Sequence, residues 1–317
     1  MNGDQGILDA AGPAAERIAD LWWAHFWPGL AVFVVVVVLL LVGLYRRHRW
    51  PADRAHEARA SIWIGVGGIA VPAVILLVVL VFTVRSMAQH SASSRDAEER
   101  GLSIRVVGYQ WWWDITYQDP QPSRRVRTAN EINIPVGRPI LLLLESGDVN
   151  HSFWVPRLQG KLDLIPGQTN TLWLEAREPG VYRGQCAEYC GEQHAHMGLV
   201  VVAQPPEEFD RWYEGQLGTA AEPTDSAALL GQEVFMRSGC AVCHAVRGTD
   251  AMASVAPDLT HLASRRTLGA GTIPNTRGYL GGWIANPQAI KPGNRMPAMP
   301  MDGPDLQALL AYLETLR

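Results

Sequence analysis

The chain has 317 residues, of which 48% are hydrophobic and only 18% are charged, and its formal net charge is −4. Ordinary soluble domains contain about 25% charged residues, so this composition indicates a membrane-embedded part. The length predicts two or three structural units at roughly 100–200 residues each, and the lack of a basic excess argues against nucleic acid as a partner.

Two charge-free segments near the N-terminus are long enough to cross a membrane as helices. They cover about residues 21–45 and 61–84, and each exceeds the ~20 residues that a helix needs to span ~30 Å of hydrocarbon. We therefore expect residues 1–90 to form an N-terminal segment and a transmembrane hairpin. The alternative interpretation is a pair of buried core helices in a soluble protein. A cleavable signal peptide is disfavoured, because the first segment is preceded by acidic rather than basic residues.

The charges that flank these segments predict an orientation. Arginines are concentrated in the short connection between them, at Arg46, Arg47, Arg49, Arg54 and Arg59. The N-terminal segment has one arginine and four acidic residues. Because Lys and Arg are enriched on the cytoplasmic side, the connection is expected inside the cell. The N-terminus and everything after the second helix are then extracytoplasmic.

Short apolar runs bounded by Gly, Pro or Asn characterise residues 100–216. These runs are Leu102–Tyr117, Glu131–Pro135, Ile140–Leu144, Thr171–Leu174 and Leu199–Val202. Their lengths and turn signals predict an all-β sandwich or barrel. Strand alternation would put Trp111 and Trp113 on one face and Trp112 on the other. These tryptophans are expected either to pack in the core and at its edge or to provide an exposed electron-transfer contact.

The residues between Cys186 and Met197 combine two thiols, an imidazole and a thioether. Sulfur ligands together with imidazole favour copper, and a weak Met ligand is typical of copper electron-transfer sites. A single copper would need only Cys190, His194 and Met197, with His151 as an upstream ligand. The additional thiol of Cys186 suggests instead that two thiolates bridge a pair of metal ions. A disulfide between the two cysteines and a zinc site are the alternatives.

Four parts of the sequence resemble subunit II of haem–copper cytochrome oxidases over roughly residues 15–215: the charge-free hairpin, the segments 108–113 and 151–156, and the loop 186–197. The resemblance implies a cupredoxin-like Greek-key domain that holds the dinuclear copper centre CuA. The ligands that it implies are His151, Cys186, Cys190, His194, Met197 and the backbone carbonyl of Glu188.

The same resemblance implies roles for two further residues, and the charges of this chain differ from those of many relatives. The Glu188 side chain would bind a magnesium ion shared with the catalytic subunit, and Trp111 would be the residue through which electrons reach CuA. Many relatives have carboxylates around this domain for docking a basic cytochrome c. This chain instead carries Arg124, Arg125 and Arg127, which makes docking of that kind less favourable.

The sequence after the β-rich region has a different character. Residues 217–225 have the composition of a linker, and residues 226–317 lack strand patterns. Within the latter, Cys240-Ala-Val-Cys243-His244 is the attachment signature of c-type haem, in which both thiols bind the vinyl groups and the His is an axial ligand. A thioredoxin-like redox pair is the alternative, although no βαβ pattern surrounds the motif.

The distal haem ligand is expected shortly before the last helix. That helix is predicted by Leu306, Leu309, Leu310, Leu313 and Leu316 at helical spacing. The preceding segment, residues 291–301, resembles the methionine loop of cytochrome c domains, and Met296 is the predicted ligand. Met299 is its main rival, Met301 is expected to be a packing or surface residue, and His261 is the minority alternative. The predicted fold class of residues 226–317 is an all-α class I cytochrome c domain.

The two sites and the resemblance together predict a function. The chain is expected to be the subunit through which electrons enter a caa-type, proton-translocating cytochrome c oxidase of the bacterial inner membrane. Electrons would pass from an external donor through haem c to CuA and then to the catalytic subunit, which reduces oxygen to water; no oxygen-reduction site is expected on this chain. Expected partners are subunits I and III and a donor that is a soluble cytochrome, a copper protein or a quinol-oxidising complex. A CuA-containing nitric oxide reductase and a free-standing membrane-anchored electron carrier are the alternatives.

Overall fold

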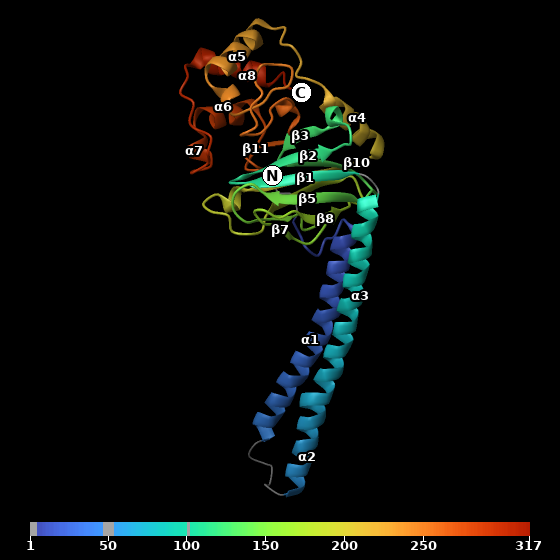
Figure 1. The fold of residues 1–317 in the computed structure, drawn as a ribbon. Helices are drawn as coiled ribbons and strands as arrows, with labels where there is room; N and C mark the ends of the chain where they lie inside the picture. The colour runs from blue at the N-terminus through green and yellow to red at the C-terminus, as the bar shows by residue number, and fades with distance from the viewer. Residues whose placement is uncertain (1–4, 47–53, 100–101) are drawn as a thin grey trace. The chain divides into compact units, whose positions relative to one another are not determined.

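The computed structural model describes residues 5–46, 54–99 and 102–317 (Figure 1). The chain divides into two units, of which one is Glu16–Ser93 and the other combines the residues up to Ala15 with Ser94–Arg317. The predicted fold class is confirmed, since two apolar helices, a β-sandwich and a helical domain are all present.

The first unit is helical. Helix α1 spans Pro13–Arg46, and helix α2 (Arg54–Gly65) continues through the π-helical turn η1 (Val66–Ala70) into α3 (Val71–Glu99). The stretches Pro13–Arg46 and Ala60–Ala88 are long and apolar enough to cross a membrane, and their apolar side chains are exposed rather than buried as in a core helix. Both helices are longer than the charge-free segments, because polar and charged residues at their ends are also helical. Arg47 and Arg49 of the arginine-rich connection lie outside the described residues, and the orientation stays a prediction.

Two five-stranded sheets form the sandwich (Figure 1). One sheet has the order β3-β2-β1-β5-β8 and the other β4-β10-β9-β6-β7, with parallel pairing only between β1 and β5 and between β4 and β10 among the described strands. The strands are β1 (Ser103–Tyr109), β2 (Trp112–Gln118), β3 (Val126–Ala129), β4 (Glu131–Pro135), β5 (Ile140–Ser146), β6 (His151–Trp154), β7 (Leu162–Leu164), β8 (Asn170–Leu174), β9 (Gly180–Cys186) and β10 (Gly198–Gln204).

The apolar run 102–117 is divided between two strands. Strands β1 and β2 pair antiparallel, and the turn between them contains Gln110 and Trp111. The expected alternation of the three tryptophans is therefore wrong, because Trp111 lies in a turn and not in a strand. Trp113 is fully buried in the core, whereas Trp111 and Trp112 are half-buried.

The core of the sandwich follows the two-residue period of its strands. In β5, Ile140, Leu142 and Leu144 are fully buried, as expected when alternate side chains point to one face. Helix α4 (Pro206–Leu217) closes the sandwich and packs Trp212 against Tyr117 with a ring-centroid distance of 5.2 Å.

Residues 226–317 form the helical domain. Its helices are α5 (Ser226–Arg237), α6 (Arg277–Ala285), α7 (Pro287–Ile290) and α8 (Gly303–Leu313), with a two-stranded sheet of β11 (Thr267–Leu268) and β12 (Ile273–Pro274). Helices α5 and α8 approach closely at Gly231, where a Cβ would lie 2.0 Å from the carbonyl oxygen of Ala308. Helix α8 contains four of the five leucines that were predicted to form the last helix, and Leu316 lies after its end. The short helices α6 and α7 were not predicted.

Candidate functional site

Two neighbouring strands bring the first metal-ligand candidates together. Cys186 ends β9 and His151 begins β6, and the strand pairing places Phe153 opposite Cys186. As a result, Nδ1 of His151 lies 3.9 Å from Sγ of Cys186. The donor atoms of His151, Cys186 and Cys190 all lie within 4.8 Å of one another, and the three residues are buried.

The loop after β9 supplies the remaining candidates. Sγ of Cys190 lies 3.8 Å from Sγ of Cys186, 3.6 Å from Nδ1 of His194 and 3.8 Å from Sδ of Met197. The carbonyl oxygen of Glu188 lies 3.2 Å from Sγ of Cys186. All four cysteines lie within the described residues and are free thiols, which disfavours the alternative disulfide.

This donor set fits a pair of copper ions better than one metal ion. Two sulfurs lie at the centre, each sulfur faces one imidazole, and a thioether and a carbonyl oxygen are available as weaker ligands. Two thiols this close cannot both ionise easily. The hydrogen bond from Cys190 lowers the pKa of Cys186 to about 3, and the same contact raises the pKa of Cys190. Only bound cations would stabilise both thiolates together.

Two features of the surrounding structure position His151, and neither was predicted from the sequence. Nε2–H of His151 donates to Oδ1 of Asp148 at 2.9 Å, which leaves Nδ1 facing the sulfur. A Cβ at Gly108 would lie only 2.9 Å from Cδ2 of His151, so the buried ring requires a glycine there. Burial lowers the pKa of His151, but hydrogen bonds to Cys186 and Asp148 outweigh it and the pKa is raised.

Trp111 lies directly beside the copper loop. Its indole Nε1–H donates to the carbonyl oxygen of Cys190 at 3.0 Å, and the Gln110 side chain donates to the same oxygen at 2.8 Å. Glu188 is exposed on the loop. His196 is held by the side chain of Gln193 through its Nδ1 atom.

The residues of the c-type haem motif suit that group. Cys240 and Cys243 are half-buried free thiols. Nδ1 of His244 donates to the carbonyl oxygen of Pro257 at 2.8 Å, so Nε2 is left as the ligand atom. Burial lowers the pKa of His244, which favours the neutral imidazole that binds iron.

The candidates for the distal haem ligand differ in their surroundings. Met296, Met299 and Met301 are all half-buried against the apolar core that also contacts Cys240. Both ring nitrogens of His261 are engaged elsewhere, with the carbonyl oxygen of Arg317 at 2.7 Å and with Arg247 at 3.2 Å. These contacts disfavour His261 as the ligand, and the three methionines remain.

Comparisons with known proteins identify the families of both domains. Residues 102–204 match the family described as cytochrome c oxidase subunit II, periplasmic domain, and residues 228–317 match cytochrome c. Cytochrome c oxidase subunit 2 of Alkalihalophilus pseudofirmus is 36% identical over 98% of this chain and 90% of its own length. The chain belongs to the cytochrome c oxidase subunit 2 family. It carries a cytochrome c domain after the periplasmic domain of that family.

Two further relatives are more distant or shorter. The subunit 2 of Bacillus sp. strain PS3 is 30% identical over 78% of this chain and 72% of its own length. The crystal structure of the periplasmic domain of subunit II of cytochrome oxidase from Bradyrhizobium japonicum is 30% identical, with a TM-score of 0.35 and coverage of 37% of this chain and 94% of that chain.

Membership of this family decides several expectations. The chain is an oxidoreductase component through which electrons enter an oxidase, and its two domains are those that bind CuA and haem c. It therefore works in a complex with subunit I and with an electron donor. Its two apolar helices and its periplasmic domain fit a membrane-anchored protein with an extracytoplasmic part.

Proposed function

We propose that this subunit transfers electrons from an external donor through haem c to CuA and on to the haem of the catalytic subunit, where oxygen is reduced to water. One observation carries the first half of this path. The segment of residues 291–296, which begins at Lys291 and ends at Met296, lies against the copper loop. The ammonium group of Lys291 donates to the carbonyl oxygens of Trp111 and His196, both at 2.7 Å.

The copper site would be held by residues of the sandwich domain. Cys186 and Cys190, as thiolates, and the imidazoles of His151 and His194 would hold the copper ions. Met197 and the carbonyl oxygen of Glu188 would act as weak ligands; the complete set is His151, Cys186, Glu188, Cys190, His194 and Met197. When bound, the copper pair supplies a one-electron carrier. His151, Cys186 and Cys190 are buried, which limits the access of water to the centre of the site.

The haem site would be held by residues of the helical domain. Cys240 and Cys243 would form the thioether bonds, His244 would be the proximal ligand, and Met296 would be the distal ligand. Two contacts hold the backbone of Met296: its N–H donates to the side chain of Asn294 at 2.9 Å, and its carbonyl accepts from Gln288 at 3.0 Å. A thioether ligand favours the high potential that suits a donor to a terminal oxidase.

Trp111 is proposed as the residue through which electrons reach CuA. Its indole nitrogen contacts the carbonyl oxygen of the ligand Cys190, and its own carbonyl accepts from Lys291 of the haem domain. In this subunit, therefore, the partner that faces Trp111 would be the chain's own haem domain. The three arginines predicted to weaken docking of a basic cytochrome are partly engaged within the chain: Arg124 pairs with Glu214 and Arg127 pairs with Asp114.

Several finer expectations remain proposals. The exposed carboxylate of Glu188 would bind a magnesium ion shared with subunit I, and subunit III would complete a proton-translocating complex in the bacterial inner membrane. The family membership favours oxygen over nitric oxide as the final acceptor. Membership in an oxidase subunit family also disfavours a free-standing carrier.

The proposed path is tested by rapid mixing of the oxidised membrane complex with a reduced soluble cytochrome under anaerobic conditions. We expect the haem c band to change first and the CuA band to follow. Cys186→Ser should remove the mixed-valence copper signal and leave haem c reduction unchanged. If CuA is reduced just as fast when haem attachment is blocked by Cys240→Ser together with Cys243→Ser, haem c is not on the path.

A further inference from the structure

Lys291 is an unusual residue in this chain. Lys161 and Lys291 are the only lysines among the 27 Lys and Arg residues of the sequence. Lys161 is exposed, whereas Lys291 is only 2% exposed. A buried cation is costly unless its donors are satisfied, so the surroundings of this ammonium group must compensate for its burial.

Three carbonyl oxygens satisfy the ammonium group. It donates to Trp111 and His196 at 2.7 Å and to Gly269 at 3.0 Å. An ammonium group has three N–H donors, so each donor has one acceptor. A guanidinium group is flat and has five donors in a fixed fork, which does not match three carbonyls that converge on one point. This geometry accounts for a lysine at position 291, although nearly all other basic residues of the chain are arginines.

The three acceptors belong to two domains. Gly269 and Lys291 are part of the helical domain, whereas Trp111 and His196 belong to the sandwich. Trp111 contacts the carbonyl of the ligand candidate Cys190, and His196 directly precedes Met197. The ammonium group therefore joins the helical domain to the backbone of the copper loop at His196 and to the neighbouring turn at Trp111.

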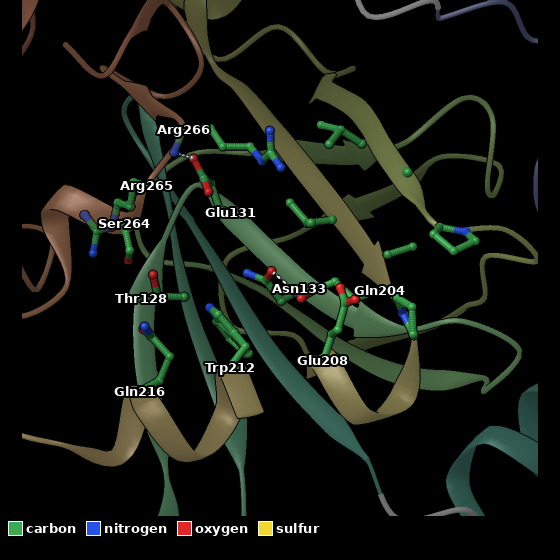
Figure 2. Close-up of a pocket in the computed structure, with 16 residues that line it drawn as sticks. Thr128, Glu131, Asn133, Gln204, Glu208, Trp212, Gln216, Ser264, Arg265 and Arg266 are labelled. Carbon is green, nitrogen blue, oxygen red and sulfur yellow. Dashed lines mark hydrogen bonds between the residues drawn. The ribbon is translucent and has the colours of Figure 1, made fainter. Parts of the chain in front are cut away.

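A buried carboxyl group of the sandwich contacts the helical domain in turn. Glu131, the first residue of β4, is 6% exposed, and its carboxyl Oε1 accepts from the backbone N–H of Arg266 at 2.6 Å and of Thr267 at 3.1 Å. Figure 2 shows Glu131 beside Arg266, with the hydrogen bond as a dashed line. The two residues line a pocket of about 340 Å³ between the sandwich, α4 and the segment 264–266.

A backbone hydrogen bond also joins the two domains. The N–H of Gly198, directly after the ligand candidate Met197, donates to the carbonyl oxygen of Ala270 at 2.9 Å. A cation of the helical domain thus contacts carbonyls of the sandwich, and an acid of the sandwich contacts amides of the helical domain. Such polar groups fix one orientation, because each loses its partners when the domains slide or separate.

We propose that Lys291 and Glu131 hold the helical domain on the copper loop in one fixed orientation, so that non-covalent contacts and not the linker keep the two sites together. The competing arrangement is a tethered domain that visits the copper loop by diffusion, in which the linker alone supplies a high effective concentration. The effect on electron transfer rests on the proposed function, whereas the docking itself does not.

The test uses the membrane complex with a protease recognition sequence inserted between Glu222 and Pro223, in the exposed part of the linker. After cleavage and washing, covalent haem is measured in the membranes and in the wash. The helical domain should stay with the membranes when Lys291 is present. Lys291→Met should release at least about tenfold more of it, since the two buried hydrogen bonds to Trp111 and His196 of the sandwich are lost. The matched control Lys161→Met should behave as the unmodified sequence.

Further measurements separate docking from folding and from the electron path. Released domain with an unchanged haem spectrum shows that Lys291→Met has not unfolded it. Lys291→Arg keeps the charge but not the geometry and should also release the domain, as should Glu131→Ala. The proposal is overturned if cleavage alone releases the domain, or if Lys291→Met retains it fully.

The rate of haem-to-copper electron transfer in uncut complexes provides an independent readout. We expect a fall of about tenfold or more in Lys291→Met, with the mixed-valence copper signal unchanged. Retention of the cut domain together with an absence of electron transfer would contradict the proposed function but leave the docking intact.

Discussion

Asp148 and His151 form the contact that orients the first copper ligand. Oδ1 of Asp148 accepts from Nε2 of His151 at 2.9 Å, and Oδ2 accepts from the backbone N–H of Gln110 at 2.8 Å. One carboxylate therefore fixes both the imidazole and the turn that carries Trp111. Arg295 of the helical domain lies 3.5 Å from the same carboxylate, so the residue that orients a ligand also contacts the neighbouring domain.

Asp148→Ala should weaken copper binding. The imidazole of His151 would lose the acceptor that keeps Nδ1 facing Cys186, and loss of such an orienting partner lowers metal affinity by about 10–100-fold. The measurement is competition for copper with a chelator of known affinity. Asp163→Ala, which removes an exposed carboxylate from β7, should leave the affinity unchanged. Equal affinities in both variants would show that Asp148 does not orient the ligand.

Gly108→Ala should disrupt the same ligand through packing. The new methyl group would lie 2.9 Å from Cδ2 of His151, and this ring is fully buried and held by Asp148, so it cannot move aside. Overpacking of this kind costs about 1–3 kcal/mol. We expect a lower melting temperature and a diminished mixed-valence copper signal. Gly215→Ala in α4, where nothing lies within 4 Å of the new Cβ, is the matched control and should keep the copper signal.

Sequence patterns were most informative where the chemistry is local. The loop from Cys186 to Met197 carries five of the six proposed copper ligands within one short stretch, and the haem motif is five residues long. Their donor types and spacing therefore predict two sites without any knowledge of the fold. The short apolar runs and the turn residues that bound them likewise predict a β-sandwich, since both are local properties of the chain.

Contacts between distant segments could not be predicted in this way. Asp148 matters only because β6 brings His151 beside Cys186, and Gly108 matters only because the ring of His151 packs against β1. Lys291 was noticed only as part of a methionine-loop pattern, and its three acceptors come from three separate segments. The turn at Trp111 was missed because an uninterrupted apolar run gives no signal of where a hairpin reverses.

The choice between Met296 and Met299 is testable by spectroscopy. Met296→Leu should remove the absorption band that arises from sulfur bound to ferric haem, because its backbone is held on both sides by Asn294 and Gln288. Met299→Leu is the matched control and should keep the band. The opposite result would assign Met299 as the ligand. Loss of the band in both variants, with covalent haem still attached, would indicate a disturbed loop rather than a lost ligand.

The pH dependence of stability should report on Glu131. Burial raises the pKa of this carboxyl above 4.5, and the amides of Arg266 and Thr267 and the charges of Arg265 and Arg266 only partly oppose the shift. A raised pKa means that the folded chain binds the proton more tightly than the unfolded chain. The stabilisation is therefore fully present below pH 4.5 and is lost as the pH rises through the raised value.

Glu131→Gln isolates this effect, because glutamine keeps an oxygen that accepts from both amides but cannot ionise. The melting temperature of Glu131→Gln relative to the unmodified chain should therefore increase as the pH rises from 4.5 to 8. Glu208→Gln, which removes an exposed charge from the same pocket, serves as the matched control. A difference between Glu131→Gln and the unmodified chain that stays constant with pH would mean that Glu131 ionises equally in the folded and unfolded chain. The contact with Arg266 and Thr267 would then be maintained by a solvated carboxylate and not by a buried one.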